Sequence, residues 1–192
     1  MHRTATVAAA GLIAAGLLSA CSNGGSTAAP EPGTPSADPA LRVPAPLPAD
    51  ALIADPCSAL PPELAAAGGL TPPGERYASP GGPACRWQSA AHEANKIFLA
   101  PLGQQKTGLA GVYANRDQDA YFEPTTIEGY PAVYAANADL RGSGTCALWL
   151  GLTDELVVNI NSSILAGPNA TNPCPVVGDV AATVVRHLKG TA

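Results

Sequence analysis

Charged residues are scarce in this sequence, and they make up only 13 % of its 192 residues. The 10 Lys and Arg residues are outnumbered by 15 Asp and Glu residues. A nucleic-acid-binding protein needs a basic patch that neutralises phosphates, so this balance argues against a nucleic-acid partner. Histidine is also rare, with 3 residues, and no G-x-S-x-G sequence is present. Because nucleophilic catalysis needs a base beside the nucleophile, we expect a protein that is not an enzyme.

Long apolar runs are missing too. The run AAAGLIAAGLLSA ends at Ala20 and follows a short segment with one Arg and one His but no acid. It is too short to span a bilayer comfortably, so residues 1–20 are predicted to be a signal peptide. Leu18-Ser19-Ala20-Cys21 resembles the bacterial lipobox, and that resemblance implies cleavage before Cys21 and a diacylglyceryl group on its thiol. The alternative is a plain secretion signal with a chance cysteine.

The segment after Cys21 lacks aromatic residues and is rich in proline. Ser22 to Asp50 holds seven prolines among Ala, Ser, Thr and Gly. Such a composition buries too little apolar surface to offset the cost of ordering, so residues 21–50 are predicted to be a lipidated cysteine and a disordered tether. The remaining residues, 51–192, are predicted to be a single globular domain.

Within that domain the patterns predict an α+β fold. Asp55 as a cap and Pro56 in the first turn are suited to begin a short helix. A terminal helix is predicted from an apolar stripe between Val176 and Leu188, with Asn172-Pro173 as its cap and first residue and Gly190 at its end. A weaker helix covers 107–117. We expect a largely antiparallel sheet of about five or six strands, with the helices packed on one face. Strands are expected at 84–89, 95–102, 145–152 and 155–163, and the last two form a hairpin that turns at Thr153-Asp154. Two further extended pieces are expected within 121–136, on either side of Glu128-Gly129.

Four cysteines remain once Cys21 is set aside, and an even number in an exported chain indicates disulfides. Cys57 and Cys174 each open a predicted helix, whereas Cys85 and Cys146 each lie in a predicted strand. Pairing Cys57 with Cys85 and Cys146 with Cys174 links each helix start to a strand, and we favour it. The alternative joins Cys57 to Cys174 and Cys85 to Cys146. A metal site is disfavoured because the cysteines form no CxxC pairs.

Two tryptophans follow these cysteines. Trp87 lies two residues after Cys85, on the same strand face, and is expected to pack against its disulfide. Trp149 lies three residues after Cys146 and faces the other way, where it either closes a second core layer or lines a ligand pocket together with Phe98.

These features together resemble a family of actinobacterial cell-envelope lipoproteins built around a domain of unknown function. The resemblance rests on the lipobox, on DPCSAL, CRW, IEGYPAV and CALWLGL in that order, and on NPC before the terminal helix. It covers most of residues 53–189. It implies a lipid-anchored protein at the outer face of the cell membrane with paired cysteines, and it implies no catalytic residues.

Other candidate sites are weaker. His92, in a turn, and His187, on the terminal helix, are interpreted as ordinary surface residues. The run NRDQDAYFE suggests a calcium loop through Asn115, Asp117 and Asp119, but Ala120 and Thr126 stand where the loop needs Gly and Glu, so we predict a polar loop.

We therefore expect a monomeric, non-catalytic binding or interaction module that needs no cofactor. Its ligand is an envelope protein, a glycan or a small amphiphile. The alternatives are a structural envelope protein and an envelope hydrolase that uses dispersed carboxylates such as Glu123, Glu128 and Asp139.

Overall fold

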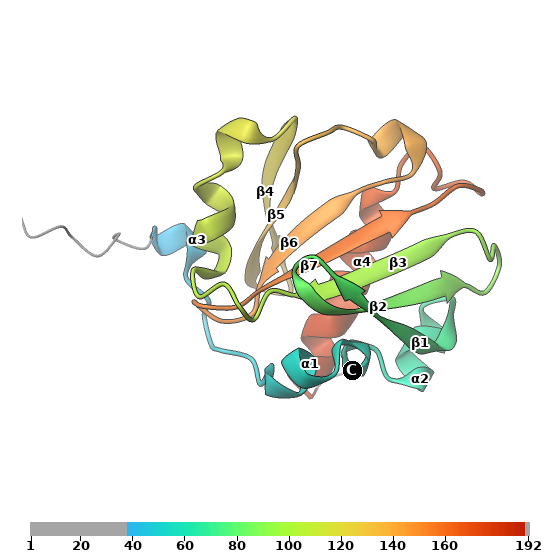
Figure 1. Ribbon diagram of the computed structural model, residues 1–192, viewed down its shortest axis with the longest axis horizontal. Helices are drawn as coiled ribbons and strands as arrows, with labels where there is room; N and C mark the ends of the chain where they lie inside the picture. Colours follow the sequence, from blue (N-terminus) through green and yellow to red (C-terminus); the bar gives the residue numbers. More distant parts are fainter. Residues whose placement is uncertain (1–37, 191–192) are drawn as a thin grey trace, which may run out of the picture. The chain divides into compact units, whose positions relative to one another are not determined.

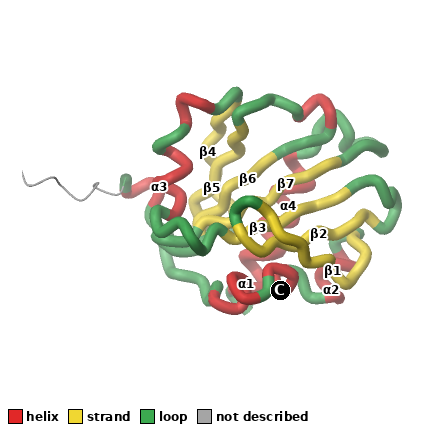
Figure 2. Tube along the Cα trace, viewed as in Figure 1, coloured by secondary structure: helices red, strands yellow, loops and turns green. Residues whose placement is uncertain are grey.

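The computed structural model describes residues 38–190, and seven antiparallel strands form its single sheet in the order β1-β2-β3-β7-β6-β5-β4 (Figures 1 and 2). The strands are β1 Leu70–Ser79, β2 Gly82–Ser89, β3 Lys96–Pro101, β4 Tyr121–Ile127, β5 Tyr130–Ala136, β6 Ala147–Gly151 and β7 Val157–Ser163. This confirms the α+β class and the antiparallel sheet. It also confirms the turn at Glu128-Gly129, where both residues have positive φ as a two-residue hairpin requires, and the hairpin turn at Thr153-Asp154.

The sheet has one strand more than the five or six expected, and the extra strand is β1. Its sequence contains Pro72-Pro73-Gly74, which argues against a central strand because proline cannot donate to the sheet ladder. β1 is an edge strand, and its pairing with β2 shifts register between Thr71 and Glu75. An edge position with a bulge tolerates these prolines.

The terminal helix α4, Cys174–Leu188, covers one face of the sheet and passes behind the strands in Figure 1. Its predicted apolar stripe is confirmed, because Val177, Val180, Ala181, Val184 and Val185 are all buried. They pack in one cluster with inward-facing strand residues such as Leu148, Leu150, Val158 and Ile160. The helix starts slightly later than expected, with Pro173 in the cap position, and Gly190 follows its end with φ +70°.

The opposite face of the sheet is also apolar, and a second helix covers part of it. Trp149 points away from its neighbours Leu148 and Leu150 and packs in a separate cluster with Val133, Val157 and α3, Gly108–Tyr113. The expectation that all helices lie on one face is therefore wrong. The weak helical pattern at 107–117 marked α3 correctly, but only the packing of Leu109 and Val112 shows which face it covers.

The domain begins earlier than residue 51. Val43 and Leu47 are buried in the main core, and Leu47 donates its backbone N–H to the Leu152 carbonyl at 3.0 Å. The Tyr130 hydroxyl donates to the Ala45 carbonyl at 2.8 Å. The prediction of a disordered tether is thus wrong for residues 38–50, because a few apolar side chains hold a proline-rich strap against the sheet. Residues 1–37, including the predicted signal peptide, Cys21 and the rest of the tether, lie outside the described residues.

Two disulfides join Cys57 to Cys85 and Cys146 to Cys174, with Cα–Cα distances of 5.1 and 5.2 Å. The favoured pairing is confirmed, and the alternative pairing is wrong. The first bridge links the short helical turn η2, Pro56–Ala59, to β2, and the Asp55 carboxylate caps that turn by accepting from the Cys57 N–H at 3.2 Å. The short helix predicted to begin at Asp55 and Pro56 is divided into η2 and α2, Pro62–Ala67.

Trp87 packs in the same core as Cys85 and is 1 % exposed, as expected from their shared strand face. Gly74 of β1 lies against both residues, and a Cβ at that position would come within 2.5 Å of Cys85 Sγ and of Trp87 Nε1. Only glycine fits this close approach between the edge strand and the disulfide.

The remaining short elements are η1 Pro39–Leu41, α1 Asp50–Ala54, η3 Arg116–Gln118 and η4 Arg141–Ser143. Among residues 38–190, no helix combines the length and the hydropathy that crossing a membrane would need.

The strap makes a testable prediction. Leu47→Ala removes a buried side chain, so we expect the free energy of unfolding to fall by about 2 kcal/mol or more in urea denaturation. Arg42→Ala, on the same strap but exposed, should change it by less than about 0.5 kcal/mol. A Leu47→Ala protein as stable as the wild type would show that residues 38–50 are a tether after all.

Candidate functional site

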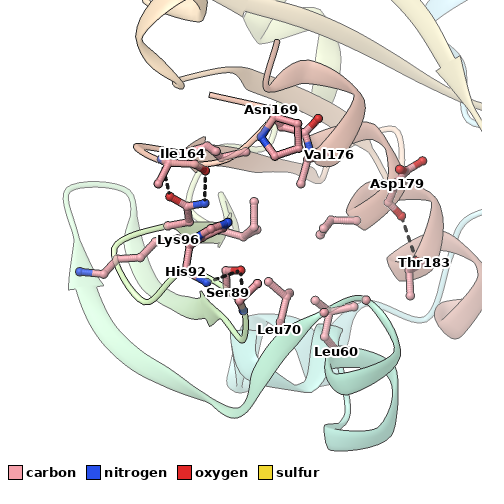
Figure 3. A pocket seen from close by; sticks show the side chains of 18 of the residues that line it. Leu60, Leu70, Ser89, His92, Lys96, Ile164, Asn169, Val176, Asp179 and Thr183 are labelled. Carbon is pink, nitrogen blue, oxygen red and sulfur yellow. Dashed lines mark hydrogen bonds between the residues drawn. The ribbon is translucent and has the colours of Figure 1, made fainter. Parts of the chain in front are cut away.

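An apolar cavity of about 450 Å³ lies between α4 and the end of the sheet formed by the β2–β3 turn (Figure 3). Aliphatic side chains from several separate segments line it: Leu60, Leu64, Leu70, Ile97, Ile164, Val176 and Val180. Its volume falls within the range of small-molecule sites, which are mostly apolar with a few polar groups. The cavity is therefore the candidate site for a ligand.

Local structure brings these side chains together. Val176 and Val180 are one turn apart on α4, so both face the same side of the helix. Leu64 belongs to α2, and Gly69, with φ +73°, turns the chain after this helix so that Leu70 begins β1 on the same wall. In Figure 3, Leu60 and Leu70 lie on one side of the space and Val176 lies across it on α4.

Asn95 holds the upper wall of the cavity in place. Its side chain is 7 % exposed and joins the β2–β3 turn to the loop between β7 and α4. Its Oδ1 accepts from the backbone N–H groups of Leu165 and Ala166 at 2.8 and 3.0 Å, and its Nδ2 donates to the Ala166 carbonyl at 2.8 Å. These bonds satisfy a buried amide and fix the two loops relative to each other.

Polar groups gather at one rim of the cavity. Ser89 Oγ accepts from the backbone N–H groups of Ala91 and His92, each at 3.3 Å. Its hydroxyl proton has no acceptor within residues 38–190, so it can be donated to a ligand. The His92 ring lies close to Gly167, where a Cβ would approach Nε2 to 2.9 Å. Asp179 and Thr183 of α4 face the rim from the other side, whereas the Lys96 side chain extends away from the space (Figure 3).

Sequence reasoning does not predict the polar residues of this site, Ser89, His92 and Asn95. The turn pattern predicts an ordinary surface residue at His92, which is indeed exposed but also lines the cavity. No sequence signal would have found it, because its neighbours Ile164 and Gly167 are more than 70 positions away along the chain.

Trp149 and Phe98 do not line this cavity. Trp149 packs in the second core layer, and it also lines a second hollow on the other face of the sheet. Its Nε1 donates to the Ala135 carbonyl at 3.0 Å. Phe98 lies on the same face but packs edge-on against Tyr77, with 6.0 Å between ring centroids, and it lines neither cavity. Neither of these two hollows brings Trp149 and Phe98 together.

The three candidate carboxylates are each paired with an arginine. Glu123 and Asp139 both accept from Arg141, at 2.7 and 2.6 Å, and Arg141 also stacks over the Tyr121 ring at 4.2 Å. Hydrogen bonds from the Arg141 guanidinium lower the pKa of Asp139 to about 2. Glu128 accepts from Arg186 at 2.6 Å. A general acid needs a raised pKa, so this cluster lacks the electrostatics of a hydrolase pair.

Within residues 38–190, no three or more His, Cys, Asp or Glu side chains cluster in a way that could hold a metal ion. The polar loop predicted around Asn115, Asp117 and Asp119 contains the turn η3, and its first and last members line the second hollow.

The fold and the cavity thus define a disulfide-bonded α+β domain with an apolar ligand-sized space. The chain belongs to the DUF3558 family, described as a protein of unknown function, which it matches over residues 16–187. No match to the chain was found among the curated proteins or among the solved structures. The two disulfides suggest an extracytoplasmic domain, because disulfides persist in oxidising compartments.

The arginine cluster gives a prediction about pH. Because folding lowers the pKa of Asp139, its pairing with Arg141 stabilises the fold fully above the unfolded pKa of about 4 and loses that effect as the pH falls through about 2. Arg141→Gln should return the pKa of Asp139 to its ordinary range, as measured by a carbon NMR titration of the carboxyl group. Arg42→Gln, at an exposed arginine, should leave it near 2; an Asp139 pKa that does not move in Arg141→Gln would contradict the assignment.

Proposed function

We propose that this protein is a lipid-anchored, monomeric lipoprotein of the cell envelope whose domain binds a small amphiphilic ligand in the apolar cavity, without catalysis. The observation that carries the binding role is the cavity itself, which has an aliphatic floor and polar groups at one rim. The anchor rests on a separate argument from the N-terminal sequence.

Three observations support lipid attachment at Cys21. Leu18 to Cys21 resembles a lipobox, and the family match starts at residue 16, so it includes this motif. The other four cysteines are paired with one another in the two disulfides, which leaves Cys21 with no partner among them. A thiol that carries lipid does not remain as a reactive leftover in an oxidising compartment.

Cys21→Ala tests the anchor. Expressed in a bacterium that processes lipoproteins, the wild-type protein should partition with membranes and incorporate labelled fatty acid. The variant should do neither, because no acyl chain is attached. Ser22→Ala, the neighbouring residue, serves as the control and should behave as the wild type. A Cys21→Ala protein that still partitions with membranes would show that the anchor lies elsewhere.

An amphiphile fits the cavity better than a wholly polar ligand does. Aliphatic groups form the floor, so an apolar tail would be removed from water there, at about 25 cal/mol for each Å² buried. Ser89 and His92 at the rim offer hydrogen bonds to a polar head. The amide oxygen of Asn95 does not, because the N–H groups of Leu165 and Ala166 already occupy it.

The alternative roles have less support. A hydrolase needs two carboxylates that converge with different pKa values, whereas Glu123 and Asp139 converge on Arg141, and Glu128 pairs with Arg186. A purely structural role gives no reason for an apolar cavity of this volume to stay open, since interiors normally pack without such voids.

Filling the cavity tests the binding role. We expect a dansylated medium-chain fatty acid to bind the wild-type domain with a blue-shifted fluorescence rise, because the probe enters an apolar space. Val176→Trp places a bulky ring in the cavity and should weaken that binding by at least about tenfold, equivalent to about 1.4 kcal/mol.

Ala182→Trp provides the matched control, since residue 182 lies on the same helix, is partly exposed and does not line the cavity. It should bind the probe as the wild type does, and circular dichroism should show that both variants fold. If the wild-type domain does not bind the probe, or if Val176→Trp binds it as tightly as Ala182→Trp does, the proposed role is wrong.

A further inference from the structure

A second hollow, of about 470 Å³, lies on the opposite face of the sheet, between β6 and β7 below and α3 with η3 above. Its lining is largely apolar too, but it contains more side-chain amides than the apolar cavity does. They include Asn115, Gln118, Asn159 and Asn161, and Asp119 and Trp149 also line the hollow. No Lys, Arg or His is among the described residues that line it.

The two asparagines of β7 are unusual for a strand in the middle of a sheet. Asparagine is depleted in strands, and the alternate positions Val158 and Ile160 are fully buried on the other face. Asn159 and Asn161 are half-buried, and Asn161 Nδ2 donates to Asn159 Oδ1 at 2.9 Å. Asn161 Oδ1 accepts no hydrogen bond within residues 38–190, so it remains available at the floor of the hollow.

The side of the hollow formed by η3 also carries side-chain oxygens that accept no hydrogen bond within the described residues. Gln118 Nε2 donates to Asn115 Oδ1 at 3.2 Å, and Asn115 Nδ2 donates to the Gly111 carbonyl at 2.8 Å. In the described part of the chain, Gln118 Oε1 and the Asp119 carboxylate accept no hydrogen bond. The lining therefore offers acceptors from both walls, and each amide nitrogen that donates internally keeps a second N–H. A ligand that matches it carries hydroxyl groups, which both donate and accept.

Trp149 adds an aromatic surface to these acceptors. Its Nε1 is already bonded to Ala135, so the indole is held by its polar edge and its carbon surface is what contacts the hollow. The face of an aromatic ring is negative, and the C–H groups on one face of a pyranose ring are weakly positive, so the two pack together. Uncharged hydroxyls with an apolar C–H face are the features of a saccharide.

We propose that this hollow binds a neutral saccharide, with pyranose hydroxyls donating to Asn161 Oδ1, Gln118 Oε1 and Asp119 and one sugar face packed on Trp149. The absence of a cation from the described lining favours a neutral sugar over a phosphorylated or uronic one. The site is separate from the apolar cavity and lies on the other side of the sheet.

The two tryptophans allow a site-specific test by NMR, because each gives one indole N–H signal in a nitrogen–proton correlation spectrum. The probes are maltohexaose, cellohexaose and mannohexaose at millimolar concentration. We expect at least one to shift the Trp149 indole signal in a saturable way, while the signal of Trp87, which is 1 % exposed, stays in place.

Variants then separate recognition from folding. Asn161→Ala should weaken the response by about tenfold, the loss expected for one hydrogen bond. Gln118→Ala should weaken it similarly and cannot disturb the core, because Gln118 is exposed. Asn172→Ala, an exposed asparagine outside the hollow, should respond as the wild type does. Val176→Trp should also respond normally, which separates this site from the apolar cavity.

Three results would overturn the proposal. One is the absence of a saturable Trp149 shift with all three hexasaccharides. Another is an unchanged affinity in both Asn161→Ala and Gln118→Ala. The third is an equal loss of affinity in Asn172→Ala, which would show that the response does not come from the hollow.

Discussion

The antiparallel pairing of β3 with β7 joins a three-stranded meander, β1-β2-β3, to a four-stranded meander, β4-β5-β6-β7. Six residue pairs form it, from Lys96 with Ser163 to Pro101 with Val158. Both candidate sites depend on this pairing. The apolar cavity includes Ile97 of β3, and the second hollow includes Asn159 and Asn161 of β7 on the opposite face.

The two disulfides attach the walls of the apolar cavity to the sheet. Each bridge attaches one wall to a different meander: Cys57–Cys85 holds η2 on β2, and Cys146–Cys174 holds the start of α4 beside β6. Cavity residues follow each bridge within a few positions, Leu60 after Cys57 and Val176 after Cys174. Covalent links thus hold the elements that carry both walls to the sheet, and Asn95 fixes the loops above.

Sequence patterns predicted the elements whose signals are local. The stripe of α4 repeats every helical turn, the Glu128-Gly129 turn has its own chemistry, and both disulfide pairs span 28 positions between a helix start and a strand. The sequence patterns did not predict β1, whose prolines are tolerated only because it is an edge strand. They also did not predict the order of residues 38–50, which depends on contacts with Leu152 and Tyr130 about 100 positions away.

The sequence by itself determined the class of the fold and the placement of Trp87 and Trp149 on opposite faces of the sheet, because strand alternation and helix periodicity set which side chains share a face. It favoured the observed cysteine pairing, and the structure excluded the alternative. Only the tertiary structure decided the sites. The apolar cavity is lined jointly by Leu60, His92, Asn95 and Val176, which long-range packing brings together. The second hollow is lined jointly by Asn115, next to η3, and Asn161 of β7. No local sequence pattern predicts which residues line the same cavity, because this depends on the strand order and on which face of the sheet each short helix covers.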